Sequence, residues 1–106
     1  MKLTYYYNLY LSTSLDKPST KESILEELKE NKLDKRLYVL VLSKNPDNNL
    51  EFFKVSYLQQ EIYQEQSFFV VGVAKDYEEA KDLVLKITKD VVTYTGEAKI
   101  REYFKT

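Results

Sequence analysis

Apolar and polar positions alternate with a period of two near the start of the chain. An extended backbone would place on one face Leu3, Tyr5, Tyr7, Leu9 and Leu11, and on the other Thr4, Tyr6, Asn8, Tyr10 and Ser12. Alternation of this kind, rich in aromatic residues, is typical of a β-strand. It predicts a first strand over residues 3–12, and the polar residues 13–18 that follow predict a loop.

A helical period replaces the alternation over residues 20–32. The apolar stripe of this segment consists of Ile24, Leu25 and Leu28. Ser19 and Glu22 have the spacing of a capping box, in which each side chain accepts a hydrogen bond from a backbone N–H at the helix start. Asn31 tolerates the left-handed conformation that often ends a helix. The pattern therefore predicts a first helix over these residues.

The longest helical pattern covers residues 77–95. Its apolar stripe consists of Ala80, Leu83, Val84, Ile87, Val91 and Tyr94. Asp76 precedes the stripe as a candidate N-cap, with Glu79 three residues later, and Gly96 follows as a stop signal. The pattern predicts a second helix with well-defined ends.

Three further segments, residues 37–43, 50–57 and 67–74, are rich in β-branched and aromatic residues. The first two flank residues 44–49, which hold asparagine, proline and aspartate and form the strongest turn signal in the chain. They predict a hairpin with a long loop. The third predicts a fourth strand.

The remaining features concern the connections. The glutamine-rich residues 58–66 predict a loop that contains one helical turn at most. Gly72, inside the fourth predicted strand, indicates a bulge or a close approach of another backbone. The tail, residues 97–106, predicts either a short helical turn or an edge strand.

The order of these elements predicts one α+β domain over residues 1–106, with the arrangement β-α-β-β-β-α. The first strand, helix and second strand allow a right-handed crossover between parallel strands. The later strands have connections too short for a crossover, which favours antiparallel pairing. We therefore expect a two-layer sandwich, a mixed four-stranded sheet with two helices packed on one face.

The second and fourth predicted strands are apolar on both faces, whereas a sheet with one face in water alternates. Two helices on one face would leave the other face open, with several hundred Å² of apolar surface, roughly the size that marks an interface. The residues expected on that open face are Tyr6, Tyr10, Tyr38, Leu40 and Leu42. We predict a homodimer through this face. The alternative coverings are the glutamine-rich segment and the C-terminal tail, folded under the sheet within one chain.

The chain contains neither cysteine nor histidine. It therefore has no thiol chemistry, no disulfide and none of the commonest general bases or metal ligands. Adjacent carboxylates on the predicted helices diverge, and Asp47 among asparagines fits a turn better than a calcium loop. We expect no catalytic residues, no metal site and no cofactor. The favoured role is a non-enzymatic protein-interaction or regulatory module.

Charge and hydropathy bear on partners and location. The formal net charge is −1, and neither half of the chain is strongly basic. The longest apolar run, residues 68–74, is far shorter than the ~20 residues that span a bilayer. We expect no membrane partner and a cytoplasmic location. The alternative function is a nucleic-acid accessory protein that stacks bases on an aromatic sheet surface, although phosphate binding normally requires more lysine and arginine.

Three features of the second half of the chain occur together: a strand that ends Val-Gly-Val-Ala before Tyr-Glu-Glu-Ala, a helix that closes at Thr95 and Gly96, and an Ile-Arg-x-Tyr tail from Ile100 to Tyr103. In these features, about half of the chain resembles a family of small uncharacterised bacterial proteins. The opening tyrosine-rich strand is also similar. No activity is attached to that family, so the resemblance implies no site residues. It implies that the chain is a complete small bacterial protein.

Overall fold

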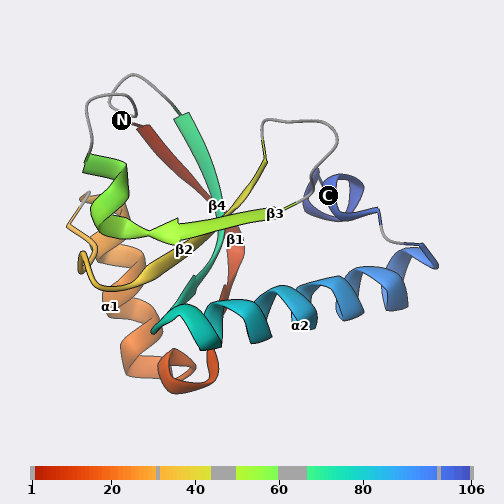
Figure 1. The fold of residues 1–106 in the computed structure, drawn as a ribbon, viewed down its shortest axis with the longest axis horizontal. Coiled ribbons are helices and arrows are strands. Elements are labelled where there is room, and N and C mark those ends of the chain that lie inside the picture. The colour runs from red at the N-terminus through yellow and green to blue at the C-terminus, as the bar shows by residue number, and fades with distance from the viewer. Residues whose placement is uncertain (1, 31, 44–49, 60–66, 98, 106) are drawn as a thin grey trace.

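A computed structural model describes residues 2–30, 32–43, 50–59, 67–97 and 99–105 of the protein (Figure 1). The strands are β1 (Lys2–Leu11), β2 (Tyr38–Leu42), β3 (Leu50–Lys54) and β4 (Ser67–Ala74). The helices are α1 (Pro18–Lys29), α2 (Tyr77–Thr95) and α3 (Ile100–Lys105), with short 3₁₀ helices η1 (Thr13–Leu15) and η2 (Val55–Gln59). The α+β class and the mixed four-stranded sheet are confirmed.

The sheet has the strand order β1-β4-β2-β3. β2 pairs antiparallel with both β3 and β4, so the predicted hairpin is confirmed, and β1 pairs parallel with β4. The expected parallel crossover between the first two strands is wrong. β4, which is apolar on both faces, lies between them and contributes buried residues to the core clusters on both sides of the sheet.

The helices cover both faces of the sheet, so the prediction that they share one face is wrong. Val39 and Val41 belong to a core cluster with Ile24 and Leu28 of α1. Leu40, between those two valines, belongs to a second cluster with residues of α2 and α3. Because successive side chains of a strand point to opposite faces, α1 packs on one face and α2 with α3 on the other. This arrangement explains why β2 has no polar face.

The two long helices begin and end as their local sequences dictate. The side chain of Asp76 accepts a hydrogen bond from the Glu79 N–H at 2.9 Å, and Gly96 adopts a left-handed conformation with φ of 76°. The capping box predicted for α1 is wrong. The helix begins earlier, with Lys17 as N-cap, because Pro18 suits the first helical position.

Gly72 lies at a register shift and also at a close approach of neighbouring elements, the two features that a glycine inside a strand predicts. The register between β2 and β4 shifts there, since Leu40 lies opposite Gly72 and Val41 opposite Val70. A Cβ atom at Gly72 would lie 3.1 Å from Leu83 Cδ2 and 3.3 Å from the carbonyl oxygen of Tyr10. The absence of a side chain therefore allows α2 and β1 to approach β4 closely.

Some expectations fall on residues that are not described. Asn31, the turn over residues 44–49 and most of the glutamine-rich segment lie outside the described residues. The third strand is shorter than predicted, because its last residues form η2. Among the helices of the described segments, none combines the length and apolar character required to cross a bilayer.

Candidate binding groove along strand β1

The five residues predicted to form an open sheet face are largely covered. Leu40 is fully buried and Tyr6 is 8% exposed, while Tyr10, Tyr38 and Leu42 are half-buried against the second core cluster. The predicted exposure of this face is therefore wrong, and the covering comes from the chain itself. α2 supplies most of the cover and the C-terminal tail, as α3, supplies the rest.

α3 is fixed over the sheet by contacts from both of its sides. The Phe104 ring meets the Tyr6 ring edge-on, with centroids 4.9 Å apart, and Ile100 is buried in the same cluster. The Arg101 guanidinium donates a hydrogen bond to the backbone carbonyl of Ser43 at the end of β2. Figure 1 shows the chain turning back after the far end of α2, so that α3 lies above the C-terminal half of that helix. These contacts make the short helix part of the core.

β1 is irregular in its middle, and the irregularity redirects two tyrosines. Its register with β4 passes from Tyr5 opposite Val70 to Tyr10 opposite Gly72, so the intervening residues of β1 bulge. As a result Tyr6 is buried beneath α3, whereas Tyr7 is 78% exposed. The alternation expected for this strand, with Tyr7 on the same face as Leu9, is therefore broken.

Three adjoining pockets follow β1 where it faces α2 and α3, and we call them together the β1 groove. The tyrosine pocket, of about 520 Å³, is lined by residues that include Tyr6, Tyr7, Asn8, Tyr94, Glu102 and Tyr103. The central pocket, of about 290 Å³, is lined by residues that include Tyr10, Lys21, Lys86 and Asp90. The serine pocket, of about 270 Å³, is lined by residues that include Ser12, Asp16, Glu79, Asp82 and Lys86. Shared lining residues connect each pocket to the next.

A hydrogen-bonded network forms the wall between the tyrosine and central pockets. The hydroxyl of Tyr10 donates to Asp90 Oδ2 at 2.9 Å and lies 2.7 Å from the hydroxyl of Tyr103. A phenol has one proton, so Tyr103 is the donor to Tyr10. The network links β1, α2 and α3 and holds the Tyr103 ring at the groove.

Two buried phenols of the groove, those of Tyr6 and Tyr10, resist ionisation. Burial raises the pKa of Tyr6 to about 12, and the hydrogen bond with Tyr7 adds to the effect. Burial also raises the pKa of Tyr10, reinforced by its hydrogen bonds with Tyr103 and Asp90. Both side chains are therefore neutral hydrogen-bonding groups at physiological pH.

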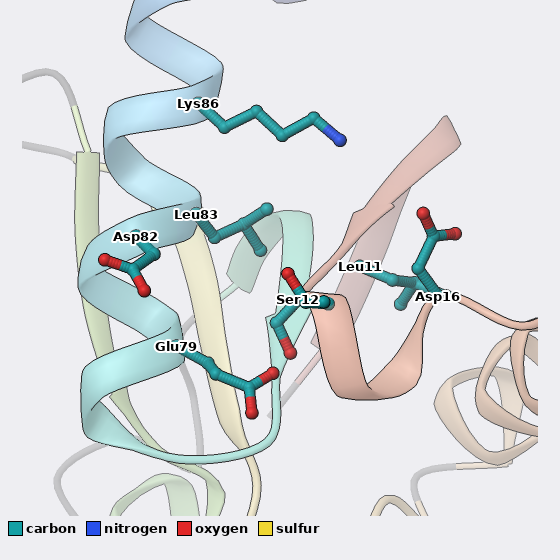
Figure 2. Close-up of a pocket in the computed structure, with 8 residues that line it drawn as sticks. Leu11, Ser12, Asp16, Glu79, Asp82, Leu83 and Lys86 are labelled. Carbon is teal, nitrogen blue, oxygen red and sulfur yellow. The ribbon is translucent and has the colours of Figure 1, made fainter.

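The serine pocket lies between η1 and the first turns of α2 (Figure 2), and hydrogen bonds between these two elements close one end of it. The carboxylate of Glu79 accepts from the backbone N–H of Ser14 at 2.9 Å and from its hydroxyl at 2.6 Å. These bonds lower the pKa of Glu79. The buried hydroxyl of Ser12 accepts from the N–H of Lys75 at 3.0 Å. Figure 2 shows Lys86 extending from α2 at the open side of this pocket.

The groove carries an excess of negative charge. Its acidic side chains are Asp16, Glu79, Asp82, Asp90 and Glu102, and its basic side chains are Lys21 and Lys86. The whole chain, by comparison, is nearly neutral, with a formal net charge of −1. Within the described segments, no group of three or more histidine, cysteine, aspartate or glutamate side chains is arranged to hold a metal ion.

Only part of this groove follows from the sequence. Tyr6 and Tyr10 are predicted there as interface residues, but as members of an open sheet face. Tyr103 is named in the tail motif, but its contact with Tyr10 and the role of Asp90 are not predicted, because Tyr10 contacts them across 93 and 80 positions of the sequence and no local pattern signals such a pair. Glu79 was identified as a capping residue, yet its carboxylate binds Ser14 of η1.

Comparison of the chain with protein-family models, with curated proteins and with solved structures found no match. The resemblance to small bacterial proteins therefore stays a prediction. The function has to be argued from the chemistry of the groove.

Proposed function

We propose that the protein is a non-enzymatic protein-interaction module, and that the β1 groove binds an extended, basic segment of a partner protein. The observation that carries the proposal is the coincidence, in one continuous groove, of exposed tyrosine rings with a surplus of carboxylates. Tyrosine faces attract lysine and arginine cations, and carboxylates pair with them.

The position of the groove beside an edge strand supports an extended ligand. Within the described part of the chain β1 pairs with β4 alone, so its other edge faces outward. After Lys2, the remaining residues of β1, 3–11, contain no charged residue and no proline, which are two of the usual protections of an edge; a bulge, which β1 has, is another. β3, at the opposite edge, carries both Glu51 and Lys54. An extended segment is thus better received along β1.

Charge favours a basic partner over a second copy of this chain. Two copies joined along β1 would bring two acidic grooves together, and like charges in contact oppose association. The sheet face on which a homodimer was predicted is covered by α2 and α3. A homodimer therefore stays a prediction, and the described part of the structure offers no exposed sheet face to support it. Light scattering at roughly tens of micromolar protein tests it.

Charge also argues against the alternative function in nucleic-acid binding. The aromatic sheet surface that would stack bases is packed beneath α2 and α3. The tyrosines that remain accessible lie among carboxylates, which repel phosphate. We therefore do not propose this role.

The direct test is titration of dye-labelled extended peptides followed by fluorescence anisotropy. A peptide of alternating lysine and threonine and a matched peptide of alternating glutamate and threonine serve as probes. We expect the basic peptide to bind, with an affinity that falls as salt is raised, and the acidic peptide not to bind. Equal binding of both peptides, or binding of neither, would contradict the proposal.

A further inference from the structure

Within the β1 groove, we propose that the tyrosine pocket is the anchor site for one arginine side chain of the bound segment, in preference to lysine. This inference rests on the proposed function and specifies which residue of the partner is read. It follows from the rings, the carboxylate and the rigidity of this pocket.

Aromatic rings from three different elements surround the pocket. Tyr7 comes from β1 and Tyr94 from the last turn of α2, and they are 78% and 77% exposed. Tyr103 comes from α3, and its ring centroid lies 5.9 Å from that of Tyr94 at an interplanar angle of 48°. Large aromatic side chains this exposed, gathered around a pocket, are characteristic of a recognition site, because a partner buries their faces.

The polar side chains that line the tyrosine pocket favour a cation. Glu102 lines the pocket from α3, and its side chain is 67% exposed, so it keeps contact with solvent and with an incoming charge. Lys99 approaches it at 3.9 Å, a distance at which an exposed ion pair contributes little and a bound guanidinium competes. The amide of Asn8 on β1 adds a hydrogen-bond acceptor.

The shape favours arginine over lysine. A guanidinium is planar and weakly hydrated, so it stacks on aromatic faces and still donates in its plane to a carboxylate. A lysine ammonium is compact and strongly hydrated, and it loses more solvation between the rings. The pocket volume of about 520 Å³ accommodates a whole arginine side chain with neighbouring backbone.

The pocket is held in shape before any ligand arrives. Tyr103 is fixed by its hydrogen bond to Tyr10, which in turn is held by Asp90. Phe104, the next residue, packs edge-on against Tyr103 with centroids 5.0 Å apart. Binding therefore requires little ordering of the pocket floor, and only the exposed Tyr7 and Tyr94 lose rotamer freedom.

The experiment compares three peptides, Ac-Gly-Lys-Thr-Xaa-Thr-Lys-Gly-amide, in which Xaa is arginine, lysine or citrulline, with wild-type protein and two variants. Tyr94→Leu removes one ring of the pocket, and Tyr57→Leu removes an exposed tyrosine on η2 that does not line it. We expect wild type to bind the arginine peptide about tenfold more tightly than the lysine peptide, with the citrulline peptide weaker still.

The variants decide whether the pocket is the origin of that preference. We expect Tyr94→Leu to bring the arginine and lysine peptides within about twofold of each other, and Tyr57→Leu to keep the tenfold difference. Equal affinities for arginine and lysine in wild type, or a preference that survives Tyr94→Leu, would overturn the arginine anchor while leaving the proposed function standing. Failure of all three peptides to bind would overturn both.

Discussion

The hydroxyl groups of Tyr10 and Tyr103 lie 2.7 Å apart, although the two residues are separated by 93 positions in the sequence. This contact ties the first strand to the last helix. With the bond from Tyr10 to Asp90 it closes a path through β1, α2 and α3. The groove and the covering of the second sheet face therefore depend on the same few side chains.

Removal of the Tyr103 hydroxyl tests that dependence. We expect Tyr103→Phe to lower the free energy of unfolding by about 1 kcal/mol, the usual net contribution of a neutral hydrogen bond. Urea denaturation followed by circular dichroism measures the change. Tyr57→Phe is the matched control, since that ring is 54% exposed on η2 and should leave stability unaltered. Equal effects of the two substitutions would contradict a stabilising role for the network.

Leu40 tests whether the second face of the sheet is covered. It is fully buried beneath α2, so Leu40→Ala removes packed methyl groups and should lower stability by about 2–5 kcal/mol. Leu85→Ala, on the exposed side of α2, should change stability by less than about 0.5 kcal/mol. If Leu40→Ala were as mild as Leu85→Ala, the covering by α2 would be wrong.

The buried phenols predict a loss of stability in alkali. The folded state holds the Tyr6 proton up to a pKa of about 12, whereas the unfolded state releases it near the ordinary value of 10.0. Above pH 10 ionisation therefore shifts the folding equilibrium toward the unfolded state, and stability should fall as the pH rises toward about 12. Unfolding measured in this range, with Tyr6→Phe for comparison, checks the direction, and a flat profile in wild type would refute it.

The lowered pKa of Glu79 predicts that stability falls as the pH is lowered, whereas the raised pKa of Tyr6 predicts a fall as the pH rises. Hydrogen bonds from Ser14 lower the pKa of Glu79 in the folded state below the ordinary value of 4.5, so the unfolded state binds the proton more readily. The contribution of Glu79 is complete above that value and is lost as the pH falls through the lowered one. Glu79→Gln should therefore flatten the acid limb of the stability profile.

A second carboxylate, Asp34, contributes to stability in the same acid range, and its contribution has to be eliminated before that of Glu79 is measured. Hydrogen bonds from Arg36 lower the pKa of Asp34 to about 2. The Glu79→Gln profile is best measured in an Asp34→Asn background, and an unchanged slope there would show that the contact between Ser14 and Glu79 does not stabilise the fold.

The sequence predicted the elements better than their arrangement. The bounds of β4 and α2 agree with prediction to the residue, because strong periodicity, an aspartate N-cap and a left-handed glycine define them locally. The start of α1 differed, since proline at the first helical position outweighed the capping box. Local rules decide such features, so the sequence alone is sufficient for most of them.

The packing of helices on the sheet could not be read in this way. The apolar character of both faces of β2 correctly indicated two coverings, but periodicity does not state which helix supplies each. The bulge in β1 sends Tyr6 inward and Tyr7 outward, which reverses the pattern expected for Tyr7. The groove depends on contacts between β1 and α3, and these join the two ends of the chain.

The central claim is that local negative charge makes the β1 groove a site for a basic segment. The most direct measurement compares two double variants of equal net charge for binding of the alternating lysine–threonine peptide. Asp16→Lys with Asp82→Lys reverses exposed charges in the groove, and Glu22→Lys with Glu26→Lys reverses exposed charges on α1 that do not line it. The account predicts that the groove variant loses binding at least about tenfold while the α1 variant stays within about twofold of wild type. Equal losses in the two variants, or undiminished binding in the groove variant, would contradict it.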